Sequence, residues 1–388
     1  MTEANSERRG PLRGIKIVEL AGIGPGPVAA MFLADLGATI IRVDRKEPSG
    51  LGVEKPVQFD IGLRNRKSIR VDLKDPKGLA LVLDLIAGAD ALIEGFRPGV
   101  MERLGLGPDV CLKRNAKLVY GRATGWGQDG PLAHSAGHDV NYVAITGILN
   151  AIGRAGDPPT IPLNIMGDYA GGALFLAFGM LAGIIEARNS GLGQVVDGAM
   201  VDGAAALTAP LLSLRASGIL SDERGTNLID SGASFYDVYE CADGKYISIA
   251  PIEAKFYRLL LDKLELKDPV FDRQMDKSAW PEQRRLFAAK FITRTRAEWT
   301  ALLEGTDACF SPVLSFAEAP SHPHLAARKT FVEVDGLSQP APGPRFSRTP
   351  PDMPTPPAPL TTDNAQAALA PWLNESAIAA HRAAGTFI

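Results

Sequence analysis

The sequence has few of the side chains that build disulfide frameworks or metal sites. Its 388 residues include only three cysteines, Cys111, Cys241 and Cys309, which are far apart and odd in number. This pattern excludes a disulfide framework and favours a reducing compartment. HExxH, CxxC, GxSxG and P-loop motifs are absent, so the sequence gives no support to zinc hydrolysis, thioredoxin-type redox, α/β-hydrolase or P-loop chemistry.

A basic excess is also lacking. The chain has 41 Lys and Arg against 44 Asp and Glu, a formal net charge of −3. Proteins dedicated to nucleic acids carry a strong basic excess, so we expect no nucleic-acid partner. Any polyanionic ligand must therefore meet a local basic cluster.

Long hydrophobic runs are scarce as well. The first ten residues contain no apolar stretch, so we expect neither a secretory signal nor a transit peptide, and a cytoplasmic protein. The stretch 169–185 has 17 residues without a charge, but four of them are glycines. Because it is short for a membrane span, we predict a buried helix that packs closely through its glycines, and no membrane partner.

Alternating strand-like and helix-like segments dominate the first third of the chain. We predict strands at 15–20, 39–44, 68–73, 90–94 and 117–122, and helices at 28–36 and 75–89. Gly37 stands where a left-handed residue ends a helix. Asp75 and Pro76 begin the second helix as its N-cap and its first-turn proline. Strands separated by helices indicate a doubly wound, Rossmann-like parallel α/β sheet.

A change of composition marks a second, smaller α/β domain. The segment 169–214 is rich in Ala and Gly and is predicted to be helical. From about 235 the sequence is aromatic and alternating, with an Asp243-Gly244 turn between two strands. Three helices and a proline-rich segment follow, and a last helix runs from Asn374 to Gly385. We expect a flexible tail at 1–10, a large domain at 11–200, a linker helix at 201–227, the small domain at 228–325 and a proline-rich return linker at 326–359.

The glycine-rich segment 22–29 fits the loose form of a dinucleotide-binding fingerprint, with Asp44 at the end of the next strand. Two prolines argue against that interpretation. Pro25 and Pro27 have no N–H to offer a pyrophosphate. Arg45, directly after Asp44, suits an additional phosphate better than a free ribose hydroxyl. Nicotinamide or flavin binding is therefore disfavoured.

Basic residues crowd the second and third predicted strands and the loop between them. For Arg42 and Arg70 we favour ordinary surface charge. Arg45 and the segment 64–67 stand at strand edges, where open α/β sheets bind ligands. Guanidinium groups with a nearby ammonium suit a nucleotide phosphate, and Arg97 and Arg103 could join them.

Three further side chains are each ambiguous by residue type alone. His138 opens a predicted helix and is either a hydrogen-bonded structural histidine or an acid/base group. Asp168 directly precedes the apolar helix, as an N-cap carboxylate or as a base or nucleophile. Glu253 begins another helix, where first-turn acids are common.

Taken together, these segments resemble the class III CoA-transferase superfamily, and within it the α-methylacyl-CoA racemases. The resemblance covers nearly the whole chain. It rests on the segments VELAGIGPGPVAAMFLADLGA, RVDR, RNRKSIRVDLK, LIEGFRPGVMERLGLGP, GRATGWGQDGP, AGHDVNY, LNIMGDYAGG, GQVVDGAMVDG, YECADGKY, APIEAKFY, TDACFSPV and PGPRFSRT. The histidine in GHDVNY, with the GD and IEAKF segments, marks the racemase branch.

The resemblance implies two interlocked, ring-like subunits, each with a large α/β domain that 338–388 completes and a smaller domain between. CoA would lie along the large domain as part of the substrate, with no other cofactor and no metal. The catalytic residues would be His138, Asp168, Glu253, which pairs with His138, and Asn164, which orients Asp168. The expected substrate-binding residues are Arg45, Arg64, Asn65, Arg66, Lys67, Gly95, Phe96, Arg97, Arg103, Gly137, Asp139 and Tyr142.

The implied chemistry inverts a carbon next to a thioester. A base on one face removes the α-proton and an acid on the other face returns one, with the roles exchanged for the opposite enantiomer. Backbone N–H groups at the start of the helix after Gly137, notably that of Asp139, would stabilise the enolate oxygen. Two alternatives stay open: a CoA-transferase with Asp168 as covalent nucleophile, and a non-catalytic acyl-CoA binder.

Overall fold

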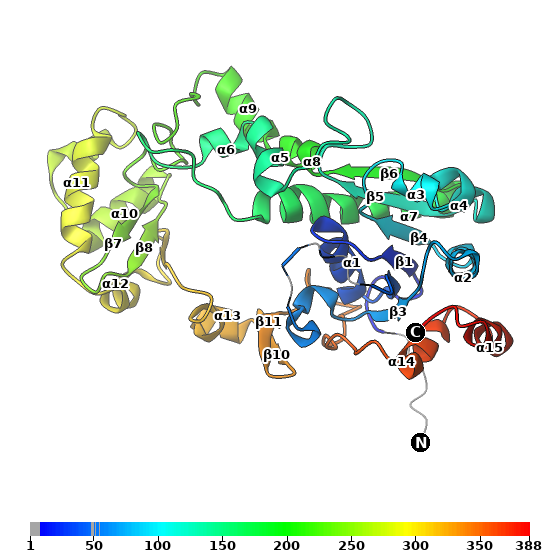
Figure 1. Cartoon of the computed structure of the whole chain (residues 1–388). Helices are drawn as coiled ribbons and strands as arrows, with labels where there is room; N and C mark the ends of the chain where they lie inside the picture. The colour runs from blue at the N-terminus through cyan, green and yellow to red at the C-terminus, as the bar shows by residue number, and fades with distance from the viewer. Residues whose placement is uncertain (1–7, 48–49, 51, 54) are drawn as a thin grey trace. The chain divides into compact units, whose positions relative to one another are not determined.

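The computed structural model describes residues 8–47, 50, 52–53 and 55–388 in two units (Figure 1). The first unit contains 1–146, 163–207 and 328–388, and the second contains 147–162 and 208–327. Most of the tail predicted at 1–10 lies outside the described residues. Two predicted boundaries are wrong. The segment 147–162 belongs with the second unit, and the expected linker helix at 201–227 is divided between the units.

A six-stranded parallel sheet in the order β3-β2-β1-β4-β5-β6 forms the first unit. The strands are β1 (Lys16–Leu20), β2 (Thr39–Asp44), β3 (Lys67–Arg70), β4 (Ala91–Glu94), β5 (Val119–Thr124) and β6 (Gln194–Ala199). This is the strand order of a doubly wound fold, with a reversal between β1 and β4. The predicted α/β class with a parallel sheet is confirmed. The sixth strand, β6, was missed because 169–214 was predicted as helix throughout.

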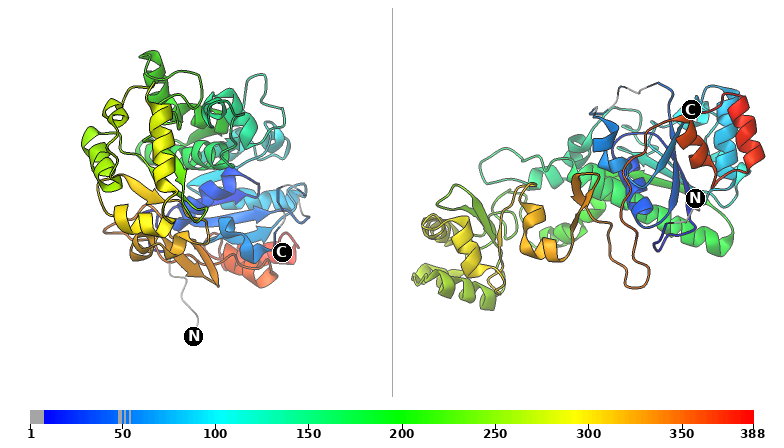
Figure 2. Two further views of the ribbon diagram at one scale, coloured as in Figure 1. Left: turned by 90° about the vertical axis from the view of Figure 1, so that its left-hand side faces the viewer. Right: turned by 90° about the horizontal axis from the view of Figure 1, so that it is seen from below.

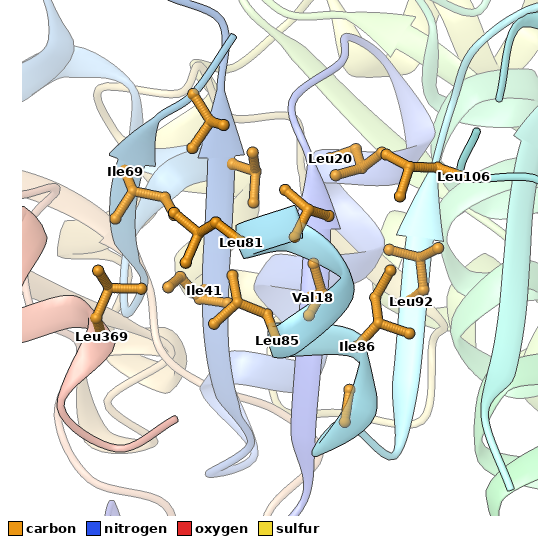
Figure 3. Packing of buried hydrophobic residues seen from close by; sticks show 14 of the residues in the cluster. Val18, Leu20, Ile41, Ile69, Leu81, Leu85, Ile86, Leu92, Leu106 and Leu369 are labelled. Atoms are coloured by element: carbon orange, nitrogen blue, oxygen red, sulfur yellow. The ribbon is translucent and has the colours of Figure 1, made fainter. Parts of the chain in front are cut away.

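Helices cover both faces of this sheet (Figure 2). On one face, Leu81, Leu85 and Ile86 of α2 pack on Val18 and Ile41 of the strands, and residues of α4, α14 and α15 complete this core (Figure 3). On the other face, α1 and α7 form a second core. The bounds are α1 Pro25–Asp35, α2 Pro76–Ala87, α3 Val100–Arg103, α4 Pro108–Arg114, α5 Asp139–Ile145, α7 Phe175–Ser190, α8 Met200–Leu207, α14 Thr362–Leu369 and α15 Glu375–Ala383.

Several helix ends follow local sequence chemistry. The Asp75 side chain accepts the Lys77 N–H at 3.0 Å and caps α2. Asn374 caps α15 in the same way. Gly37, with φ of 101°, ends the turn after α1 in the left-handed region. These predicted caps are confirmed, because each depends only on neighbours in sequence.

The apolar stretch begins earlier than predicted and in a different geometry. Residues Ile165–Leu174 form a π-helix, η3, which continues directly into α7. Together, Ile165–Ser190 is the one described helix that is long and apolar enough to cross a membrane, with a mean hydropathy of 1.8. Half of the apolar 18-residue window within this helix is buried inside the protein, as in the core helix of many globular proteins. Four of the five glycines in Ile165–Ser190 are buried.

An antiparallel sheet of β7 (Asp237–Glu240), β8 (Tyr246–Ile249) and β9 (Phe310–Pro312) forms the centre of the second unit. An aromatic core with Phe287, Phe291 and Trp299 fully buried fills the space between the sheet and its helices. The 147–162 segment joins this unit because Arg154 donates two hydrogen bonds to the buried Asp237 carboxylate. The helices of the second unit are α6 Ile148–Ala151, α9 Ala209–Ala216, α10 Ala254–Leu264, η4 Pro269–Arg273, α11 Trp280–Phe291, α12 Arg296–Leu303, η5 Ala319–Ser321 and α13 Pro323–Ala327.

The return segment contains more structure than a linker. Residues predicted as a proline-rich linker at 326–359 include a hairpin of β10 (Phe331–Val334) and β11 (Leu337–Pro340). Two short 3₁₀ turns, η1 (Val57–Phe59) and η2 (Ile61–Leu63), precede β3 in the first unit. Near the C-terminus, Arg70 and Ile388 exchange backbone hydrogen bonds. The chain end is thereby attached to β3 of the large sheet.

Candidate functional site

The candidate site lies at the carboxyl edge of the parallel sheet. In open α/β sheets, ligands bind where the strand order reverses, which here is between β1 and β4. Residues 21–24 follow β1 and 95–97 follow β4. The short helix α5 and the start of η3 carry the predicted acid/base residues.

His138 is the N-cap residue of α5, and its side chain is exposed. Its backbone N–H donates to Asn141 Oδ1 at 3.0 Å. The hydroxyl of Tyr142 donates to the carbonyl of Gly137, and the Tyr142 ring meets Trp126 edge-on at 4.7 Å. The backbone on both sides of His138 is therefore held, while the imidazole stays accessible.

Asp168 lies in the first turns of η3, half-buried. It is not the N-cap residue that the sequence predicted, because η3 begins after Asn164, four residues earlier. Asn164 Nδ2 donates to Asp168 Oδ2 at 3.1 Å. The carboxylate also faces Gly24 at the start of α1, since a Cβ atom there would lie 3.9 Å from Oδ2.

The surroundings of Asp168 raise the pKa of its carboxyl above the usual range. Burial is the main cause, and the negative charge of Asp139 adds to it. The Asn164 hydrogen bond and the charge of His138 lower the pKa in turn. The Asp168 N–H also donates to Asp139 Oδ2 at 2.7 Å, which brings Asp168 beside the residue that follows His138 in the chain.

The Asp139 side chain is a functional feature that sequence reasoning missed. Only its backbone N–H was predicted to matter, yet the buried carboxylate accepts the N–H groups of Gly167 and Asp168, each at 2.7 Å. The His-Asp pair at a helix start was visible in the sequence. Its contact with Gly167 and Asp168, which lie 28 and 29 positions later in the chain, could not be seen in the sequence.

Three residues that were predicted to bind phosphate point into the protein. This corrects the expectation that their side chains are free to contact a ligand. Arg64 Nη2 lies 2.5 Å from Asp35, and Asn65 Nδ2 donates to the same carboxylate at 2.6 Å. Arg66 Nη1 donates to Glu19 at 2.8 Å. All three side chains are buried, as is Arg42, which was predicted to be surface charge. Their charges are used to hold α1, β1 and β2 to the loop before β3.

The remaining basic residues do reach the surface. Arg45 places its guanidinium 5.3 Å from the centre of the Phe96 ring, and it lines a pocket of about 230 Å³ at the ends of β1, β2 and β3. The other exposed residues of the predicted set are Lys67, Gly95, Arg97 and Arg103. The charge of Arg97 also opposes the burial that raises the pKa of Tyr142 to about 12. The exposed basic surface is therefore smaller than predicted.

Glu94, at the carboxyl end of β4, is a second residue that the sequence did not single out. It is 3% exposed, and burial raises its pKa to about 7. The carboxylate accepts the Phe96 N–H at 2.7 Å, and Arg122 Nε lies 3.5 Å away. Glu94 thereby fixes the turn that presents Phe96 and Arg97.

Glu253 belongs to the second unit, where it is the exposed N-cap residue of α10. The prediction that it begins a helix is confirmed. Within the described ranges, no three His, Cys, Asp or Glu side chains gather closely enough to hold a metal ion.

Comparison with known proteins places this geometry in a family. The profile of CoA-transferase family III matches residues 12–364. The chain is 43% identical to α-methylacyl-CoA racemase of mouse over 341 residues, 87% of each chain. It is 41% identical to the human protein of that name over 85% of this chain and 86% of the relative. The crystal structure of a CaiB/BaiF family protein from Brucella suis matches with a TM-score of 0.80 at 26% identity, over 94% of this chain and all of that one.

Proposed function

Because the chain belongs to CoA-transferase family III, as its motifs predicted, we propose that it is an α-methylacyl-CoA racemase. It would interconvert (2R)- and (2S)-2-methylacyl-CoA thioesters through an enolate. The observation that carries the proposal is the 41–43% identity to named racemases, together with the hydrogen bond from the Asp168 N–H to Asp139, the residue after His138.

The proposed mechanism is a 1,1-proton transfer. His138 or Asp168 removes the α-proton from one face of the substrate, and the other group delivers a proton to the opposite face. The raised pKa of Asp168 suits both directions, since the carboxyl must release a proton in one and take it up in the other. The Asp139 N–H, in the first turn of α5, is the proposed donor to the enolate oxygen.

The proposed CoA site follows the exposed basic residues. Arg45, Lys67, Arg97 and Arg103 would contact the phosphates, whereas the buried Arg64, Asn65 and Arg66 would support the loop from within. Glu253 would pair with His138, as the family resemblance implies. CoA is treated as part of the substrate, and the proposed reaction needs no other cofactor and no metal.

We also propose a homodimer. Leu174, Phe178 and Ile185 on η3 and α7 are 52–70% exposed in the single chain, and Val195 on the edge strand β6 is 40% exposed. Exposed apolar side chains of this kind favour coverage by another protein surface. A second copy is the partner that the family resemblance implies. A cytoplasmic location and a place in fatty-acid metabolism remain part of the same proposal.

A single experiment separates the racemase from the transferase. The wild-type protein is incubated with one pure 2-methylacyl-CoA enantiomer in D2O, with and without an unlabelled free carboxylic acid. A racemase introduces deuterium at carbon 2 and loses chirality at that carbon in both mixtures. A transferase, which would use Asp168 as nucleophile, moves CoA to the free acid without labelling carbon 2. Absence of both outcomes at micromolar protein would favour the non-catalytic binder.

A further inference from the structure

One buried carboxylate connects the two proposed acid/base residues. Asp139 directly follows His138 in the chain and is the first residue of α5. Its side chain is 6% exposed. Oδ2 accepts the backbone N–H groups of Gly167 and Asp168, each at 2.7 Å. The main chain of Asp139 thus carries His138, and its side chain holds the main chain of Asp168.

The two N–H groups need a partner from outside their own helix. Gly167 and Asp168 are the third and fourth residues of η3, and the first N–H groups of a helix have no acceptor within it. A carboxylate near a helix start also interacts favourably with the helix dipole. The Asp139 carboxylate supplies both the acceptor and the negative charge. The start of η3 is therefore attached to α5, and its N–H groups do not depend on water as acceptor.

Gly167 gives independent evidence of this close approach. A Cβ atom at Gly167 would lie 2.6 Å from Asp139 Oδ2 and 3.2 Å from the Asp139 carbonyl oxygen. A Cβ atom at 2.6 Å is closer than real Cβ atoms come to an oxygen atom, so any other residue here would displace either the Asp139 carboxylate or the start of η3. The contact therefore depends on one carboxylate and one glycine.

We infer that Asp139 is a positioning residue that sets the separation of His138 and Asp168. The inference rests on the proposed racemase function and goes beyond the role of the Asp139 backbone N–H. Removing the carboxylate leaves the buried Gly167 N–H and the partly buried Asp168 N–H without an acceptor. The start of η3 would then shift, and Asp168 would move relative to α5 and His138. Misplacement by about 1 Å is enough to reduce a rate by roughly 10²-fold.

The test compares three variants with a matched control. Asp139→Ala removes the acceptor, Asp139→Asn keeps one oxygen for the two N–H groups, and Gly167→Ala crowds the contact while keeping the Asp139 side chain. Asp75→Ala is the control, because it also removes a carboxylate that accepts a helix N–H in the first unit, on α2. For each protein, kcat, KM and the dissociation constant for CoA are measured below the melting temperature.

We expect Asp139→Ala and Gly167→Ala to lower kcat by about 10- to 100-fold, with KM and CoA affinity changed less than about threefold. Asp139→Asn should recover most of kcat, and Asp75→Ala should leave it unchanged. If Asp139→Ala binds CoA normally and keeps wild-type kcat, the positioning role is wrong while the racemase function stands. If Asp139→Ala does not fold, Gly167→Ala and Asp139→Asn decide in the same way. A wild type without isotope exchange would overturn the proposed function itself.

Discussion

At the scale of single residues, the proposed chemistry depends on how the environment of Asp168 sets its pKa. Burial raises the pKa, and the hydrogen bond from Asn164 partly opposes that rise. A carboxyl that must both accept and donate a proton works best with a pKa nearer to the working pH. Because the Asn164 hydrogen bond opposes the effect of burial, removing it should change the pKa of Asp168.

Replacing Asn164 by Ala removes the only side-chain hydrogen bond to Asp168 among the described contacts. The pKa of Asp168 should then rise further, because the ionised form loses a donor. We expect the acidic limb of the kcat/KM profile to move upward by about one pH unit, the equivalent of one hydrogen bond to a charged group. A limb that stays in place, or moves to lower pH, contradicts this role of Asn164.

Exposed and buried arginines should respond differently to truncation. Arg45→Ala should weaken CoA binding and leave the melting temperature unchanged, because Arg45 is exposed. Arg64→Ala should destabilise the fold by about 3–5 kcal/mol, because it removes the ion-pair partner of the buried Asp35 carboxylate and leaves it the Asn65 amide as a donor. CoA titration and denaturant unfolding of both variants measure these effects. If Arg64→Ala instead weakened CoA binding without destabilising the fold, Arg64 would be a phosphate ligand.

Sequence reasoning at this scale succeeded where partners are close in the chain. The family resemblance implied that Asn164 orients Asp168, four residues away, and the hydrogen bond between them is present. Arg64 and Arg66 were predicted to bind phosphate. In the structure they donate to Asp35 and Glu19, which lie 29 and 47 residues away in the chain. Whether an arginine points inward depends on such a distant carboxylate, which composition does not indicate.

At the scale of elements, alternation of strands and helices predicted the sheet but missed its last strand. β6 (Gln194–Ala199) is an edge strand with partly exposed residues at its start, and it follows the long helical crossover of η3 and α7. Its Gly- and Ala-containing sequence resembles the flanking helices more than a buried strand. The sequence also did not predict the π-helical start of η3. The N–H groups of Gly167 and Asp168 there donate to Asp139, which belongs to another helix.

The end of β4 provides a stability test with a defined sign. Burial raises the pKa of Glu94 from 4.5 to about 7. Its contribution to stability is therefore fully present below about pH 4.5 and is lost as the pH rises through 7. Over that window the free energy of unfolding should fall by at most roughly 3 kcal/mol because of this residue.

Glu94→Gln cannot ionise, so this part of the pH dependence should disappear. We expect the stability of the variant relative to wild type to increase between pH 5 and pH 8, measured by denaturant unfolding at fixed ionic strength. Glu102→Gln is a suitable comparison, since Glu102 also binds Arg122 but is more exposed. A difference between Glu94→Gln and wild type that does not vary with pH would show that Glu94 is already ionised at pH 5.

At the scale of the whole molecule, both ends of the chain contribute to one unit. Residues 328–388 belong with the large sheet, where Leu369 packs in the core beside α2 and Ile388 bonds to Arg70 (Figure 3). The motifs located this return of the chain only through the family resemblance. The transfer of 147–162 to the second unit depends on the ion pair between Arg154 and Asp237, 83 positions apart. Local sequence signals do not indicate such a contact.

The exposed apolar side chains of η3 and α7 predict self-association. The wild-type protein should sediment at about twice its chain mass of 41.2 kDa at micromolar concentration. Phe178→Glu places a charge on a side chain that is 70% exposed in the single chain. Burial of that charge in an interface is costly, so the variant should dissociate at higher concentration than wild type. A wild-type monomer throughout the micromolar range contradicts the proposed dimer.

The measurement that tests the central claim most directly is deuterium incorporation at carbon 2 by His138→Ala and Asp168→Ala. His134→Ala is the matched control, because His134 is an exposed histidine four positions before His138. We expect wild-type exchange in the control and a loss of at least roughly 10²-fold in each of the other two variants. Wild-type exchange in either His138→Ala or Asp168→Ala would contradict a two-sided proton transfer between these residues.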